Sequence, residues 1–367
     1  MDAPMQRRQF LQTSAAVMTG GLFSGRAQTP ASKDVEWLGR IQTPPATLPP
    51  NAPPLSPLLV DGGRPIRSLV AWQARRRVLR QWWLDFLGPM PPRTGAPKWK
   101  ILEQDAIDGI VRTRIAYEVE PGVGTEAYLL RPEAPSAAPR PAAVVLHSTV
   151  AHSIRQPAGL GPDPEKAFGL SLAGRGFVTL SPRNFLWPTN ERIDAKAETA
   201  RFQAQHPRAK GMARMLRDAE VAVDLLSTLP GVNAQRIGCV GHSLGAKEVL
   251  YLAALDERVR ATVSSEGGIG LRFSNWDAEW YLGPAINSPQ FTREQHELLA
   301  LAAPRPFLLI GGDSADGDRS WPFIDAVLPV YRLYGGTARV GLLNHKGGHQ
   351  VPPEAERAIL EWCEAYI

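Results

Sequence analysis

Residues 239–248, CVGHSLGAKE, contain the pattern G-x-S-x-G around Ser243. A pattern with only three defined positions recurs by chance, so its surroundings decide what it means. An apolar run at 235–241 precedes it, and a segment with helical spacing at 245–255 follows it. A strand, a sharp turn and a helix in this order form the context in which the pattern marks a serine nucleophile. Because flanking Cβ atoms would collide in so sharp a turn, the two glycines fit it, and we expect Ser243 to stand above the edge of a sheet.

Apolar runs alternate with helical segments on both sides of this turn. The expected strands lie at 141–147, 177–182, 235–241, 258–268, 304–313 and 338–344, and the expected helices at 165–175, 210–231, 245–255 and 353–366. Continuous apolar strands that alternate with helices indicate a mostly parallel sheet with helices on both faces. The predicted fold class is therefore α/β.

The first hundred residues follow other patterns. Residues 28–65 contain too many prolines for a regular helix or strand, which predicts an extended linker that follows the protein surface. Residues 69–87 show the spacing of an amphipathic helix. From 99 to 131 apolar and polar residues alternate, which predicts three antiparallel strands. We therefore expect three parts: an N-terminal signal at 1–27, an extension at 28–98 and a catalytic domain at 99–367.

The N-terminus has the layout of an export signal. Arg7 and Arg8 precede Phe-Leu and a mildly apolar run, and a small-x-small site ends at Ala27. Paired arginines followed by Phe-Leu resemble a twin-arginine signal, which predicts a periplasmic or secreted protein. No segment reaches the roughly 20 consecutive apolar residues of a membrane span.

Composition excludes several other classes. The net charge of the 367 residues is +5, and no Lys/Arg-rich run with interleaved aromatic residues indicates a nucleic-acid surface. The motifs of zinc proteases, Cys-x-x-Cys sites and phosphate-binding loops are missing, so no metal or cofactor is expected. Cys239 and Cys363 are expected as buried thiols, although the sequence leaves a disulfide between them open.

From residue 99 to the end, the chain resembles the α/β-hydrolase superfamily. The strand, the Ser243 turn and the helix carry the resemblance, and the order of the remaining elements agrees with it. Within the superfamily the chain is most similar to the dienelactone-hydrolase and acetyl-xylan-esterase-like branch, in which residues 264–283 and 311–318 resemble signatures of esterase-like proteins.

A serine hydroxyl needs a base to remove its proton. The loop between the last expected strand and the last helix offers His345 and His349, and the superfamily places its catalytic histidine there. We favour His349, because the Gly-Gly pair before it suits a backbone that must carry the ring over the sheet.

Two positions compete for the acid that orients the histidine. Asp313 and Asp316 follow the strand at 304–312, the usual position in the superfamily. Glu266 lies 23 residues beyond the serine, a placement that resembles the glucuronoyl esterases. Those enzymes also have a lysine four residues after the nucleophile, and there it contacts sugar hydroxyls. Lys247 occupies the same position here, so the resemblance implies that it binds substrate. We favour Glu266, and the aspartates remain alternatives.

The oxyanion of an ester-cleavage intermediate needs hydrogen-bond donors placed in advance. The amide of Leu244 is one donor by its position after the serine. Glucuronoyl esterases carry an arginine at that position, so the resemblance does not identify the substrate. The superfamily takes the second donor from the loop after the strand at 141–147, where we favour Thr149 over Ser148.

Two loops are expected to form the walls of the substrate site. Trp276, Trp280 and Tyr281 lie in one, where exposed aromatic faces would stack on sugar or aryl rings, and Arg183 lies in the other, near a substrate carboxylate.

The predicted function is hydrolysis of a carboxylic ester through an acyl-enzyme. The expected substrate is a small-molecule or polysaccharide ester, either an acetyl group on xylan or a glucuronoyl ester. Hydrolysis of peptides or lactones by the same residues, and a non-catalytic glycan-binding homologue, are the alternatives.

Overall fold

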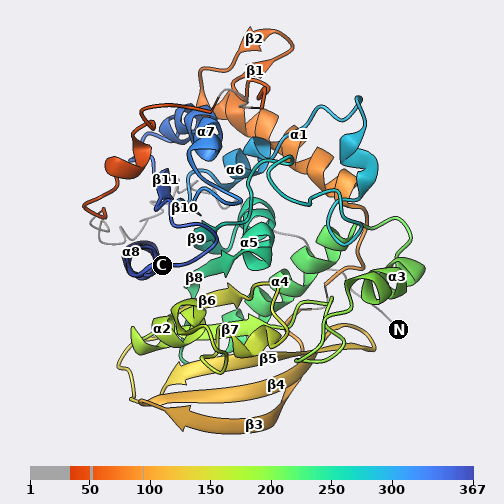
Figure 1. Ribbon diagram of the computed structural model, residues 1–367, viewed down its shortest axis with the longest axis vertical. Coiled ribbons are helices and arrows are strands. Elements are labelled where there is room, and N and C mark those ends of the chain that lie inside the picture. The colour runs from red at the N-terminus through yellow and green to blue at the C-terminus, as the bar shows by residue number, and fades with distance from the viewer. Residues whose placement is uncertain (1–33, 50–52, 94) are drawn as a thin grey trace, which may run out of the picture. The chain divides into compact units, whose positions relative to one another are not determined.

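In the computed structural model, which describes residues 34–49, 53–93 and 95–367, the apolar strands form a nine-stranded sheet (Figure 1). The strand order is β11-β10-β9-β8-β6-β7-β5-β4-β3. The bounds are β3 Trp99–Ile107, β4 Ile110–Glu120, β5 Val123–Pro132, β6 Arg140–Leu146, β7 Val178–Pro182, β8 Val232–His242, β9 Val259–Ser265, β10 Phe307–Gly311 and β11 Val340–Asn344. A separate hairpin pairs β1 (Val60–Asp61) with β2 (Arg64–Pro65).

The sheet is mostly parallel, as predicted. Strands β7, β6, β8, β9, β10 and β11 pair in parallel. β5 pairs antiparallel with β7 and continues into the β5-β4-β3 meander, which is the antiparallel unit expected from the period-two segment. The predicted α/β class is confirmed, and the parallel strands bring their carboxyl ends to a common edge.

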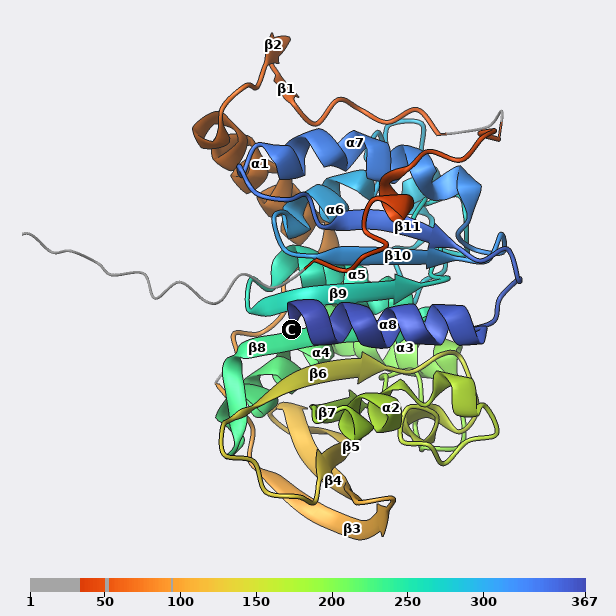
Figure 2. The same ribbon diagram turned by 90° about the vertical axis from the view of Figure 1, so that its left-hand side faces the viewer.

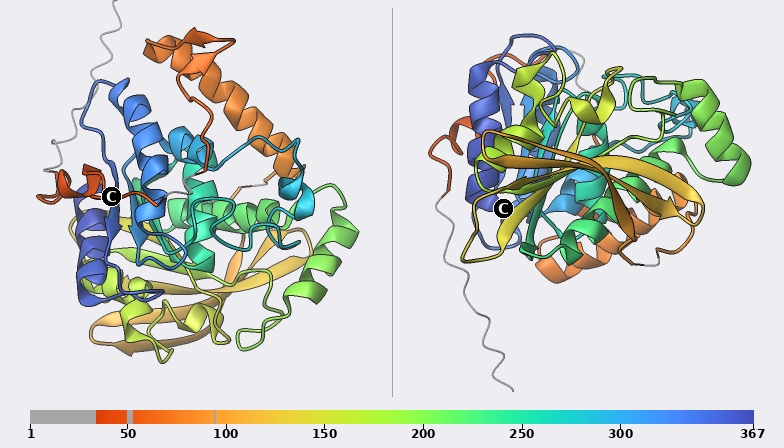
Figure 3. Two further views of the ribbon diagram at one scale, coloured as in Figure 1. Left: turned by 45° about the horizontal axis from the view of Figure 1, so that its top comes forward. Right: turned by 90° about the horizontal axis from the view of Figure 1, so that it is seen from below.

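Helices cover both faces of the sheet. Their bounds are α1 Leu69–Leu87, α2 Phe168–Gly174, α3 Ala195–Gln205, α4 Gly211–Thr228, α5 Leu244–Leu255, α6 His296–Ala302, α7 Trp321–Arg332 and α8 Pro353–Tyr366. Short 3-10 turns occur at η1 Arg40–Gln42, η2 Ser153–Arg155, η3 Pro164–Lys166, η4 Pro284–Asn287 and η5 Asp318–Ser320. One apolar core lies between the sheet and α1, α4, α5, α6 and α7, and a second lies between the other face and α2 and α8. Figure 2 shows α8 in front of β8 and β9, running along the strands, and Figure 3 shows α8 and α1 on opposite sides of the sheet.

This layering separates the two cysteines. Cys239 packs in the core with α4 and α5, whereas Cys363 packs in the core under α8. Both thiols are free and buried, and burial raises the pKa of Cys239 to about 12. The disulfide that the sequence left open is therefore not formed.

The described part of the proline-rich extension lies against the domain, as expected for a segment that follows its surface. Ile41 in η1 is 1% exposed and lies against Gly341, where a Cβ would overlap the Ile41 side chain. The Gln42 side-chain amide donates to the carbonyl of Val340, the first residue of the edge strand β11, and to that of Ala338 just before it. Residues 34–49 thus occupy part of an edge that would otherwise present unpaired carbonyls.

We expect Ile41→Ala to lower the free energy of unfolding by about 2–5 kcal/mol, because it empties a buried site against β11. Chemical denaturation measures the change. Val70→Ala is the matched control: Val70 is 83% exposed on α1, and its truncation is expected to have an effect within about 0.5 kcal/mol. Equal effects of the two substitutions would contradict the docked arrangement of residues 34–49.

Three helices lie where the sequence analysis assigned none: α3, α6 and α7. α6 spans only seven residues, and α7 contains Pro322 and Pro329, which obscure its helical pattern. α1, in contrast, starts at the expected residue, and the Ser68 side chain accepts a hydrogen bond from the Ala71 amide at its N-terminus.

The predicted signal at 1–27, with Arg7 and Arg8, lies outside the described residues. Within the described residues, no helix combines the length and the apolar character needed to cross a bilayer.

Candidate active site

Ser243 lies at the sharp turn that the sequence predicted. β8 ends at His242, α5 begins at Leu244, and Ser243 between them has φ 57° and ψ −113°, a strained left-handed backbone. A Cβ at Gly241 would overlap the carbonyl group of Gly245, and a Cβ at Gly245 would overlap the carbonyl of Leu146 on β6. Both glycines are therefore required by close backbone approach, as expected.

The loop between β11 and α8 brings His349 to a buried carboxylate. His349 Nδ1 lies 3.2 Å from Glu266 Oε2, across 83 residues of sequence. Glu266 follows β9, is 1% exposed and has a positive φ of 57°. The amides of Gly312 and Ala315, in the loop after β10, both donate to its carboxylate. Glu266 Oε1 is thus held by the Gly312 amide, and Oε2 is shared by the Ala315 amide and His349.

Asp316 and Asp313, the alternative acids, have other partners. Asp316 is fully buried and accepts hydrogen bonds from the amides of Gly268 and Ile269 and from the Ser320 hydroxyl. Burial raises the pKa of this carboxyl. It joins the loop after β9 to the loop after β10.

Asp313 accepts a hydrogen bond from the Asn344 side chain at 2.7 Å and another from the Asp318 amide. The carboxylate in contact with His349 is therefore that of Glu266. His345, the alternative histidine, accepts a hydrogen bond at Nδ1 from the Gly347 amide.

A cavity of about 370 Å³ joins these groups. Six residues singled out in the sequence line it: Ser243, His349, Glu266, Leu244, Thr149 and Lys247. Tyr281, from the predicted aromatic loop, also lines it. The sequence analysis did not assign the remaining lining residues to the site: Phe273, Ser274, Asn275, Ser314 and Ala315. Ser314 and Ala315 lie between the two candidate acids Asp313 and Asp316, and their own residue types do not indicate a site.

Leu244 and Thr149, the two residues favoured as oxyanion donors, both line this cavity, and their backbone amides are free to donate. Leu244 is the first residue of α5, and such an amide has no acceptor within its own helix. The Ser148 amide donates to Gln156 Oε1 at 2.9 Å, which removes Ser148 as a donor. In the part of the chain that the structure describes, the Thr149 amide has no protein acceptor.

Lys247 is buried in the cavity wall with few polar partners. Its Nζ donates to the Gly267 carbonyl at 2.7 Å and lies 4.2 Å from the centre of the Trp276 ring and 5.2 Å from that of Tyr281. Lys247 follows Ser243 by one helical turn, and the residue is 5% exposed. Burial lowers the pKa of Lys247 to about 7, although the charge of Asp316 opposes the shift.

Trp276 does not form the expected stacking platform. It is fully buried, and its Nε1 donates to the Gly268 carbonyl. Its ring is covered because it packs against Tyr251 and Tyr281 and beneath the Lys247 ammonium. It therefore supports Lys247 instead of binding a ligand.

Trp280 and Arg183 also lie away from the Ser243 cavity. The Trp280 backbone packs so closely on Gly211 that a Cβ there would overlap it, and its ring lies edge-on to Tyr281. Arg183 donates to Asn190 and lies 3.8 Å from Glu126. Neither residue is among those that line the Ser243 cavity, so the structure does not support their predicted place in the walls of the substrate site.

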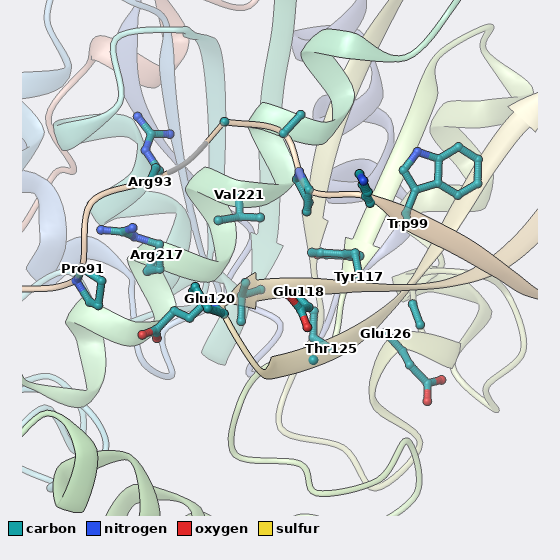
Figure 4. A pocket seen from close by; sticks show the side chains of 18 of the residues that line it. Pro91, Arg93, Trp99, Tyr117, Glu118, Glu120, Thr125, Glu126, Arg217 and Val221 are labelled. Atoms are coloured by element: carbon teal, nitrogen blue, oxygen red, sulfur yellow. The ribbon is translucent and has the colours of Figure 1, made fainter.

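Arg183 lines a second cavity, of about 790 Å³, bounded by the segment 91–100, β4, β5 and α4. Figure 4 shows it with Trp99 at one end and Arg217 at the other. Its charges have mixed sign, and Arg93 is paired with Glu220 and Asp224. Residue 94, inside the bounding segment, lies outside the described residues.

We expect the stability of the wild type to depend on pH through Lys247. A lysine whose pKa is about 7 when folded and 10.5 in its ordinary state binds its proton more weakly in the folded protein. The penalty for burying the charge is therefore complete below pH 7 and is relieved as pH rises above it. Relative to Lys247→Met, the wild type should gain about 2 kcal/mol between pH 7 and pH 9. Thermal melting of both proteins measures this, and parallel pH curves would contradict the low pKa.

The strand order and the strand–Ser243–helix turn define an α/β-hydrolase fold. Residues 125–292 match the family model "Dienelactone hydrolase family". This agrees with the resemblance seen in the sequence. The match includes Ser243, Glu266 and Thr149, and His349 lies beyond it.

Known proteins with this fold resemble the chain over most of its length. A curated relative, "Putative hydrolase YtaP" of Bacillus subtilis (strain 168), is 26% identical over 237 residues, which cover 62% of this chain and 77% of the relative. A glucuronoyl esterase from Solibacter usitatus superposes with a TM-score of 0.69 at 17% identity, covering 88% of this chain and 99% of that one. A protein from Bacteroides fragilis NCTC 9343, described as a "putative acetyl xylan esterase", gives a TM-score of 0.62 at 16% identity, over 76% and 77% of the chains.

Proposed function

We propose that this protein is a serine esterase that acts on carbohydrate esters. The observation that carries the proposal is the cavity shared by Ser243, His349 and Glu266, with Ser243 on a strained turn and His349 paired to a buried carboxylate. A strained nucleophile, a histidine and an orienting acid are the three parts that acyl transfer through serine requires.

The reaction would proceed in two halves. His349 removes the Ser243 proton while the hydroxyl oxygen attacks the ester carbonyl, and Glu266 stabilises the imidazolium that forms. The amides of Leu244 and Thr149 hold the oxyanion. His349 then gives its proton to the leaving alcohol, and a water molecule, activated in the same way, releases the acid from Ser243. Within the described residues, Ser243 and His349 both line the cavity but form no direct hydrogen bond. In enzymes without bound substrate this contact is often long and tightens only when substrate binds.

The cavity favours a polar substrate. Beside the reactive groups it presents the hydroxyl of Ser274, the amide of Asn275 and the ammonium of Lys247. Hydroxyl-rich sugars match these donors and acceptors. The folds of a glucuronoyl esterase and of a protein described as an acetyl xylan esterase agree with this choice, so we propose an acetyl group on xylan or a glucuronoyl ester as the substrate.

The test is a hydrolysis panel of acetylated xylan, a glucuronoyl ester and p-nitrophenyl esters of rising acyl length. We expect a carbohydrate ester to give the highest kcat/KM. Preference for long acyl chains would refute the carbohydrate assignment. A fluorophosphonate probe is expected to label Ser243, and an unlabelled protein would indicate a binding protein without hydrolase activity.

We also propose that the protein is exported to the periplasm, on the basis of Arg7 and Arg8 in the sequence. A reporter fused to residues 1–30 should reach the periplasm, and Arg7→Lys/Arg8→Lys should keep it inside the cell. Export that survives the double substitution would indicate a general secretory signal instead.

A further inference from the structure

His242, the residue before the nucleophile, contacts His349 from below the cavity. Their ring centres lie 4.8 Å apart, and the planes are inclined by 42°. His242 does not line the cavity and is 2% exposed, whereas the side chain of His349 is 44% exposed. The buried ring is therefore a rigid neighbour for the exposed one.

His242 is held in one orientation by a neighbouring strand. Its Nδ1 lies 3.0 Å from the hydroxyl oxygen of Ser265, the last residue of β9. Its Nε2 is buried and has no partner among the described residues. The hydrogen bond between Nδ1 and the Ser265 hydroxyl fixes the orientation of the ring in either tautomer.

The surroundings of His242 keep its ring uncharged. Burial lowers its pKa well below the ordinary histidine value, and His349, Lys166 and His345 lower it further in that order. Lys166 comes from η3, and the two histidines come from the loop after β11. A neutral ring beside His349 adds no repulsion when the latter becomes an imidazolium.

We propose that His242 is a positioning residue: its ring supports that of His349, so that Nδ1 stays on Glu266 while Nε2 is presented to Ser243. This inference rests on the proposed function. The reason is geometric, because the single hydrogen bond to Glu266 leaves the His349 ring free to turn about that bond. The contact with His242 restricts this turn.

The experiment compares His242→Phe, which keeps an uncharged ring, with His242→Ala, which removes it. The readouts are kcat and KM on one activated ester and the downfield NMR signal of the His349 Nδ1 proton shared with Glu266. For His242→Ala we expect kcat to fall on the order of 10²-fold with KM unchanged, as for a misplaced catalytic group, and the proton signal to disappear. His242→Phe should stay within about tenfold of wild type and keep the signal.

A His242→Ala protein with wild-type kcat and an unchanged proton signal would overturn the proposal. So would a His242→Phe protein as impaired as His242→Ala. If His242→Ala does not fold, Ser265→Ala decides, because it releases the ring and should lower kcat severalfold without changing KM; no change would refute the proposal. Failure of the proposed function is distinct, since wild-type Ser243 would then not react with a fluorophosphonate.

Discussion

Replacing Ser243 by alanine is expected to lower kcat on the order of 10⁶-fold, as removal of a nucleophilic serine does in other enzymes. The substitution removes only the hydroxyl oxygen that would attack the ester. Alanine keeps the same Cβ, so the strained turn at φ 57° is unchanged, and the melting temperature should stay that of the wild type. The measurements are kcat on an activated ester and thermal melting.

Ser274→Ala is the matched control, because Ser274 also presents a hydroxyl to the cavity. We expect Ser274→Ala to lower kcat/KM by no more than on the order of tenfold, because it removes at most one hydrogen bond to the substrate. His345→Gln should likewise remain active. A Ser243→Ala protein that keeps a tenth of the activity would show that Ser243 is not the nucleophile.

Glu266→Gln is expected to lower kcat roughly 10⁴-fold on every ester that the enzyme cleaves. The amide would lose the charge that stabilises the His349 imidazolium. With its oxygen beside His349, its NH₂ group would meet the Gly312 amide, which donates to the other oxygen of Glu266. With its NH₂ group beside His349 instead, the side chain would donate to Nδ1 and favour the tautomer of His349 that cannot accept the Ser243 proton. The measurement is kcat with thermal melting as a control for folding.

Asp313→Asn and Asp316→Asn provide the comparison. Asp313→Asn should leave kcat near that of the wild type. Asp316→Asn should cost about 1–3 kcal/mol of stability, because Asp316 accepts three hydrogen bonds in a buried loop contact, and should retain most of kcat when folded. If Glu266→Gln stayed active and one of the aspartate variants were inactive, the acid that orients His349 would be an aspartate of the loop after β10.

Much of the fold could be predicted because its signals are local. The apolar runs of the parallel strands, the period-two meander at 99–131 and the helix at 69–87 each follow from spacing within a few residues. α7 was missed because Pro322 and Pro329 conceal a helix that tertiary packing stabilises. The segment 34–49 was expected to follow the surface, but its contact partners on β11 and α8 could not be predicted because they lie about 300 residues away in the sequence.

The sequence by itself determined the turn at Ser243, since its two glycines are required by backbone contacts that any strand–turn–helix of this kind creates. It also placed a histidine in the last loop, by chain order. Only the tertiary structure decided which carboxylate meets that histidine, because Glu266 and Asp316 come from adjacent strands and differ only in the direction of their side chains. It likewise decided that Trp276 is buried and Lys247 is not free in solvent. Backbone constraints act between sequence neighbours and can therefore be predicted from the local sequence. Burial and side-chain partners depend on residues that meet only after the sheet has formed.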